Sequence, residues 1–192
     1  MNRRHFVQRM GSFALLSFAG SFSLALTGCN AFTDIEAWVP VGIAAVNSIV
    51  KLLGAFLPPG ASAIITLVLA GLTDLAQAVR DYNADQNPAD KATLLAKIRT
   101  LLTDIAKNFQ DVLNAVAGNN PIIGIVLALA QVFLSALAGF LGELPAASAP
   151  KMVRLGSQTL PVTPKRYKKP AGFVTDFNNV CVRLNHPEAE IK

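Results

Sequence analysis

Apolar and polar positions along residues 33–143 follow the spacing of four helices. The clearest pattern lies in residues 88–117, where apolar side chains recur every three or four positions and charged side chains occupy the remaining faces. The repeating positions are Leu94, Ile98, Leu101, Ile105, Phe109, Val112 and Val116. Asn87 is suited to cap this helix, and Pro88 is suited to its first position. The pattern predicts a long helix with one packed face.

A helix is also predicted on the N-terminal side, and proline sets its start. Pro40 is tolerated in a first helical turn but not deep inside a helix. Thr33 and Glu36 have the spacing of a capping box. We therefore expect a short turn over residues 33–38 and a main helix that begins near Val39.

The remaining two predicted helices, over residues 61–83 and 121–142, are more apolar. Residues 121–142 have no charged side chain, and Gln131 and Ser135 are their most polar members. As a helix these 22 residues would extend about 33 Å, which is enough to cross a bilayer. Abundant Ala and Gly suit close helix packing in a soluble core as well as in a membrane. Both interpretations stay open, and the buried central helix is preferred.

Short connections between these helices favour antiparallel neighbours. The expected fold is all-α: an antiparallel four-helix bundle made of two helical hairpins, with a mostly irregular Pro/Lys-rich C-terminal tail. The predicted division is a signal peptide over residues 1–28, the bundle over 29–143 and the tail over 144–192. The bundle is expected to leave excess apolar surface at the end where helices two and four begin, for a bilayer or another copy of the chain.

The C-terminal tail is predicted to be a basic linker up to residue 172. Residues 144–192 contain 8 Lys and Arg against 3 Asp and Glu. A compact cluster is the candidate contact for anionic lipid headgroups or envelope phosphates. It consists of Lys165, Arg166, Lys168 and Lys169. A solvated flexible linker is the preferred interpretation of this cluster, and the anionic contact is the alternative. Further on, Val180, Val182 and Leu184 alternate as in a short strand, and two aromatic residues, Phe173 and Phe177, are candidates to dock on the bundle.

The inventory of reactive side chains argues against catalysis. The chain has two cysteines and two histidines, and His5 lies in the leader. A Cys/His metal cluster or a Ser-His-Asp triad is therefore nearly excluded, and no glycine-rich phosphate loop is present. We expect no enzyme activity, no cofactor and no metal. Cys181 is expected to be a small packing residue, although an intermolecular disulfide stays open.

The N-terminus has the organisation of an export signal: a positive start, an apolar middle and a small-residue cleavage region. Arg3 and Arg4, followed by Phe6, resemble the twin-arginine motif, although its last position, often Lys, is Gln8 here. Export by the general secretory route and an uncleaved membrane anchor are the alternatives.

Leu26, Thr27, Gly28 and Cys29 resemble a bacterial lipobox at all four positions. The resemblance implies cleavage between Gly28 and Cys29 and acylation of the Cys29 thiol, with palmitate among the acyl groups. It covers residues 1–29 only and identifies a processing class, not a domain family. Asn30 follows, not Asp, and this favours the outer membrane by resemblance to enterobacterial sorting rules. The expected location is the bacterial cell envelope, at the periplasmic face of a membrane.

Two functions are consistent with these features. The first is a lipid-anchored, non-enzymatic structural or binding module held in the membrane through Cys29. The second is a membrane-inserting protein whose apolar hairpins oligomerise, as in a pore or a membrane-remodelling element. Nucleic acid is not an expected partner of an exported chain. Because the first helix follows Cys29 closely, the bundle is expected to sit against the bilayer with Trp38 near its interface.

Overall fold

The computed structural model describes residues 25–116, 122–144, 152–155 and 158–192, and describes side chains from residue 31 onward with gaps at 55, 117–121 and 145–161. The export motif expected at Arg3, Arg4 and Phe6 lies outside the described residues. Within the described part, the chain is predominantly helical, as the sequence predicts.

Four long helices come first: α1 (Ala25–Leu53), α2 (Pro59–Ala84), α3 (Pro88–Val116) and α4 (Ile123–Glu143). A short hairpin follows, with β1 (Met152–Leu155) antiparallel to β2 (Gln158–Pro161), and then α5 (Pro170–Arg183). Two single-turn 3-10 helices, η1 (Gly54–Phe56) and η2 (Pro187–Ala189), follow α1 and α5.

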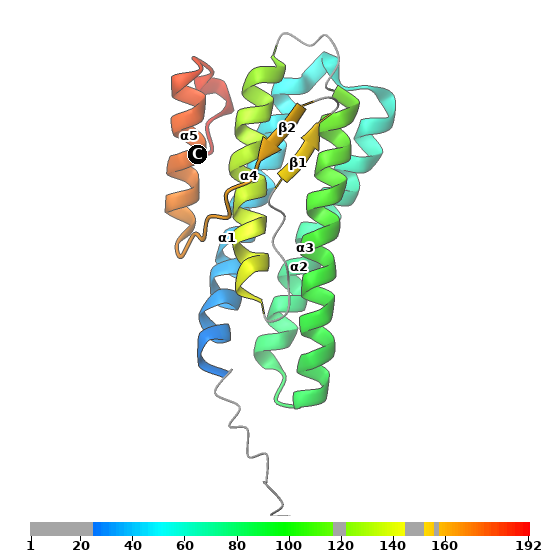
Figure 1. Ribbon diagram of the computed structural model, residues 1–192, viewed down its shortest axis with the longest axis vertical. Coiled ribbons are helices and arrows are strands. Elements are labelled where there is room, and N and C mark those ends of the chain that lie inside the picture. The colour runs from blue at the N-terminus through cyan, green and yellow to red at the C-terminus, as the bar shows by residue number, and fades with distance from the viewer. Residues whose placement is uncertain (1–24, 117–121, 145–151, 156–157) are drawn as a thin grey trace, which may run out of the picture.

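The long helices run side by side, and successive ones point in opposite directions (Figure 1). Helix α1 lies against α2 and α4, while α3 contacts both α2 and α4. Helix α5 packs on α1 and α4, and β1 lies beside α3. Buried residues from all five α-helices form one hydrophobic cluster. The C-terminal residues therefore belong to the same core as the long helices.

Helix α1 differs from the sequence prediction because it runs without a break from Ala25 to Leu53. The prediction of a separate turn at 33–38 and a helix start near Val39 is wrong, since Pro40 lies inside the helix. An internal proline removes one backbone hydrogen bond and costs roughly 3 kcal/mol. Pro40 itself is exposed, whereas Trp38 and Val39 are buried. Burial of the opposite face on both sides of the proline outweighs this local cost.

Helix α3 begins as the sequence predicts. The Asn87 side-chain oxygen accepts a hydrogen bond from the Ala89 backbone N–H at 3.0 Å, and Pro88 is the first helical residue. Ile98, Ile105 and Phe109, from the predicted apolar face, are buried. The signals that place this helix are local ones, within a few residues of its start.

The tail prediction is wrong in two respects. Residues 144–172 are not an irregular linker throughout, because they contain the β1–β2 hairpin and the start of α5. The segment around Val180 is helical rather than a strand. Its buried residues, Phe173, Phe177, Val180 and Cys181, have helical spacing. The expected docking of Phe173 and Phe177 is confirmed, since both are fully buried.

Helix α5 ends in a Schellman motif. Asn185 has a φ of 59°, a left-handed conformation that asparagine tolerates better than most residues. The His186 N–H donates to the Cys181 carbonyl at 2.8 Å, and the Asn185 N–H donates to the Val182 carbonyl at 3.0 Å. The chain then turns back, and Asn178 hydrogen-bonds both the backbone N–H and the carbonyl of Ile191.

Trp38 joins three helices at the centre of the core. Its ring lies 5.3 Å from that of Phe140 in α4 and 5.6 Å from that of Phe173 in α5. Gly42 leaves room for the indole, because a Cβ at that position would lie 2.9 Å from it. Trp38 is fully buried. Its ring therefore packs inside the protein, and its expected place near a bilayer interface stays a prediction.

Candidate functional site

Residues 162–169, which we call the strap, cross α4 on their way to α5 (Figure 1). The Lys165 N–H donates to the Ser135 carbonyl of α4 at 2.9 Å. Gly139, one turn further along α4, lies directly beneath the strap, and a Cβ there would be 3.0 Å from the Arg166 backbone nitrogen. Val162 and Tyr167 are buried. Backbone contact and two buried side chains therefore hold the strap on the helix.

Arg166 ties the strap to both helices beneath it. Its Nη2 lies 3.0 Å from Asp34 Oδ2 in α1, and its Nε lies 2.8 Å from Glu143 Oε1 at the end of α4. The two carboxylates are mostly shielded from water, with side-chain exposures of 14% and 22%. One guanidinium thus bridges two carboxylates that are distant in sequence.

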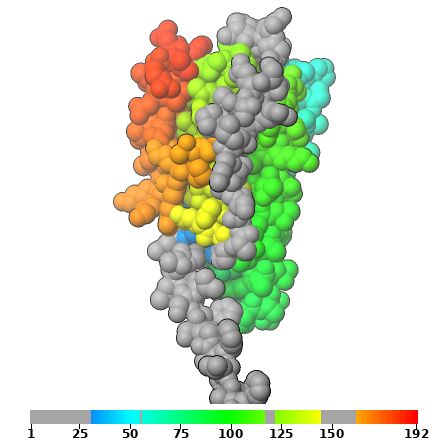
Figure 2. Space-filling view, in the orientation of Figure 1, coloured from blue at the N-terminus to red at the C-terminus, as the bar shows by residue number. Residues whose placement is uncertain are grey.

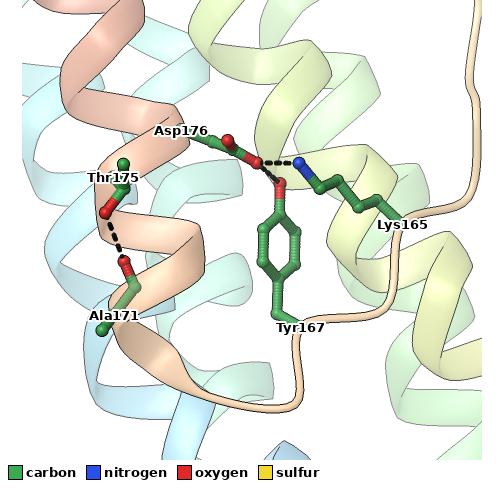
Figure 3. Close-up of polar contacts among 5 residues, drawn as sticks. All are labelled: Lys165, Tyr167, Ala171, Thr175 and Asp176. Carbon is green, nitrogen blue, oxygen red and sulfur yellow. Dashed lines mark hydrogen bonds and ion pairs between the residues drawn. The ribbon is translucent and has the colours of Figure 1, made fainter.

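A second polar cluster joins the strap to α5 (Figure 3). The Tyr167 hydroxyl donates to Asp176 Oδ2 at 2.6 Å, and the Lys165 ammonium forms an ion pair with the same oxygen. Burial opposes ionisation of Asp176, but the hydrogen bonds from Lys165 and Tyr167 and the charge of Lys165 together hold its pKa below the ordinary value. Burial, together with the Asp176 carboxylate, raises the pKa of Tyr167. This cluster is a clasp in which the tyrosine stays neutral.

An open groove of about 520 Å³ lies between α4, the strap and α5. Each helix contributes four lining residues at spacings of three, one and three positions, which is one helical face. They are Ala128, Gln131, Val132 and Ser135 of α4, and Asp176, Asn179, Val180 and Arg183 of α5. The strap adds Thr163, Pro164, Lys165 and Tyr167. Figure 2 shows the strap, in orange, at the surface beside α5.

The groove has a different character at its two ends. Helices α4 and α5 run in opposite directions (Figure 1), so Ser135 and Asp176 share one end while Ala128 and Arg183 share the other. The clasp occupies the first end. Arg183 is exposed and forms no ion pair with any residue that the structure describes. Val132 and Val180 lie between the two ends and give the groove an apolar stretch.

The predicted basic cluster is divided by the fold. Lys165 and Arg166 are engaged by the chain's own carboxylates. Lys168 and Lys169 are exposed, and no salt bridge links them to another residue in the described part of the chain. The candidate contact with an anionic surface is therefore reduced from four cations to two.

Cys29 lies in the first turns of α1, and the side chains of residues up to 30 are outside the described part. Ala31 and Phe32 are already buried in the core. Cleavage between Gly28 and Cys29 would leave the cysteine as the first residue of α1, with a single residue before the packed core. Asp34 follows Cys29 by five residues, which corresponds to about 7.5 Å along the helix axis.

Within the part of the chain that the structure describes, three helices are long and apolar enough to cross a membrane: Ala31–Leu53, Pro59–Ala84 and Ile123–Glu143. Each helix contains an apolar stretch of 18 residues, and the three stretches differ in the share of their residues that is buried: 39%, 33% and 61% in the same order. The most apolar, α4, is the most buried. The least buried, α2, exposes Leu67 at 57%, and Phe56, just before α2, is 51% exposed. The expected excess apolar surface is therefore found on α2 rather than on α4.

Reactive groups elsewhere are few. No group of three or more metal-ligating side chains occurs among the described residues. Cys181 is fully buried, and burial raises the pKa of its thiol to about 11, which keeps the thiol protonated at neutral pH. This is the packing role that the sequence predicts. His186 is paired with Glu188, with 2.7 Å between Nδ1 and Oε1.

Sequence reasoning did not find the groove. One feature of the sequence indicates the groove. Gln131 and Ser135, the most polar residues of an otherwise apolar segment, are four positions apart and hence lie on one face of the helix. Comparison with protein-family models, curated proteins and solved structures gives no match for this chain.

Proposed function

We propose that the protein is a bacterial cell-envelope lipoprotein, anchored through an acylated Cys29, whose helices form an antiparallel four-helix bundle that acts as a non-enzymatic binding module. The observation that carries this proposal is the burial of α4. In helix α4, 61% of the residues in its 18-residue apolar stretch are buried within the one chain. The lack of charge over its residues 123–142 is then explained by packing against α1, α3 and α5, without lipid. The pairwise contacts among α1–α4 support the bundle topology.

The anchor would hold the body close to the membrane. Because α1 continues from Cys29 into the core, the lipid would be joined to a rigid element rather than to a flexible tether. Arg166 contacts Asp34 near this end of α1, so the strap lies close to it as well. Lys168 and Lys169, two and three residues further on, are the candidate contacts with anionic headgroups, each contributing on the order of 1 kcal/mol near such a surface.

The second candidate is a membrane-inserting protein, and the exposed face of α2 favours it. Leu67 is 57% exposed, and only 33% of the residues in the 18-residue apolar stretch of α2 are buried. The Thr66 and Thr73 hydroxyls donate to carbonyls one turn earlier in the same helix, which satisfies them without water. Such a face could contact lipid or another copy of the chain.

Membrane extraction separates the two candidates. Exchanging residues 1–29 for a cleavable secretory signal without cysteine gives a mature chain that lacks the acyl group. On the binding-module proposal, alkaline carbonate releases this chain into the supernatant while the wild-type protein stays in the membrane pellet. Retention of both chains in the pellet would favour insertion. If a Leu67→Gln substitution in the chain without the acyl group then abolished this retention, the insertion would be assigned to α2.

A further inference from the structure

The groove between α4 and α5 combines an apolar stretch with an unpaired cation. Among the described residues that line it, the one carboxylate, that of Asp176, already accepts hydrogen bonds from Lys165 and Tyr167. No other acidic side chain among the described groove residues is therefore placed to neutralise Arg183. A guanidinium in this position is suited to bind a carboxylate or phosphate oxygen through paired hydrogen bonds.

The residues around Arg183 extend this chemistry. Asn179 lies one turn before Arg183 on the same face of α5 and supplies an amide N–H donor. Val132 and Val180 line the groove between Arg183 and the clasp, and Ala128 lies at the Arg183 end. An occupant with an anionic head at Arg183 and a short apolar body along α4 would match both features. A charged body would lose its hydration against these apolar side chains without compensation.

We propose that this groove binds a small amphipathic organic anion, with its acidic group at Arg183 and its apolar body between α4 and α5. The inference deepens the proposed role as a binding module and rests on it. It does not depend on the lipid anchor, so a failure of Cys29 acylation leaves it intact. The ligand chemistry is common to fatty carboxylates and alkyl phosphates, and the two are separated by the choice of probe.

Isothermal titration calorimetry on the full-length Cys29→Ala chain tests the proposal. The probes are octanoate, octyl phosphate and the uncharged octanamide. We expect saturable 1:1 binding of at least one anion, with octanamide weaker by about tenfold or more, since a charge-assisted hydrogen bond is lost. The tighter of octanoate and octyl phosphate identifies the head group as carboxylate or phosphate.

The Arg183→Gln variant tests whether the anion binds in the groove. Arg183 is exposed, so its replacement is expected to leave the fold intact. The variant should lose about tenfold or more in affinity for the anion and bind octanamide as the parent chain does. Arg80→Gln, an exposed arginine on α2 outside the groove, is the matched control and should bind like the parent. The proposal is overturned if neither anion saturates, if octanamide binds equally well, or if Arg183→Gln and Arg80→Gln behave alike.

Discussion

Gly139 and Lys165 are in direct backbone contact, because the Lys165 carbonyl occupies the space that a side chain on Gly139 would need. The Lys165 N–H also donates to Ser135, one turn earlier on the same helix. This contact lets residues 162–169 lie on α4 closely enough for Arg166 and Tyr167 to reach their partners.

Substituting Gly139→Ala should displace the strap. The added methyl group overlaps backbone atoms, which yield less than a flexible side chain, and overpacking of this kind costs about 1–3 kcal/mol of unfolding free energy. Chemical denaturation measures the loss. Gly124→Ala in the same helix is the control, since nothing lies within 4 Å of its added Cβ. That variant should be neutral or more stable by up to about 1 kcal/mol. Equal behaviour of the two variants would contradict the contact.

The Arg166 bridge should contribute to stability through both of its carboxylates. Arg166→Gln is expected to lower the unfolding free energy by about 1–3 kcal/mol, because it leaves Asp34 and Glu143 partly buried without their cation. A double-mutant cycle with Asp34→Asn should give a coupling energy of about 0.5 kcal/mol or more. Lys169→Gln, at an exposed position nearby, should change stability by less than about 0.5 kcal/mol. Strict additivity in the cycle would show that the pair is not coupled.

Helix α5 should be an integral part of the core. Phe173→Ala removes a fully buried ring that packs against Trp38, and the expected loss is about 3–5 kcal/mol. Trp38 is the only tryptophan of the chain, so its fluorescence reports the same contact and should shift to longer wavelength as water gains access. Val182→Ala, on the exposed side of α5, should leave both stability and emission nearly unchanged. An unchanged Trp38 spectrum in Phe173→Ala would indicate that α5 does not dock.

The clasp predicts a dependence of stability on acidic pH. The pKa of Asp176 is lowered in the folded chain, so its contribution is present above the unfolded carboxyl pKa and is lost as pH falls through the folded value. Tyr167→Phe removes one of the hydrogen bonds that lower this pKa. The acid-unfolding midpoint, followed by circular dichroism, should therefore move to higher pH.

Thr175→Ala is the control for the clasp. Its hydroxyl donates to Ala171 within α5 and does not touch Asp176 (Figure 3). This variant should keep the acid midpoint of the parent chain. If both variants shift the midpoint by the same amount, the hydrogen bond from Tyr167 is not the cause.

Local signals predicted the start of α3 and the helical character of the long segments. Asn87, Pro88 and the apolar repeat act within a few residues of one another, so the sequence carries them directly. The prediction from Pro40 was wrong because the structure there depends on contacts with other helices. The local cost of Pro40 is outweighed by packing with α2 and α4, which a single segment does not reveal.

The error at α5 has a similar cause. Val180, Val182 and Leu184 alternate as a strand would, yet Val182 and Leu184 are exposed while Phe173 and Phe177 determine which face is buried. The groove depends on contact between α4 and α5, which are separated by the hairpin and the strap. Only the polar pair on α4 was visible in the sequence. The partners of Lys165 and Arg166 required the fold.

On the proposed function, Cys29 becomes the acylated first residue of the mature chain. Mass spectrometry of the N-terminal peptide from the membrane fraction, comparing the wild type with Cys29→Ala, tests it most directly. We expect a wild-type peptide that begins at Cys29 and carries acyl groups, and a Cys29→Ala chain that keeps its leader. A wild-type chain with an unmodified Cys29 thiol would contradict it.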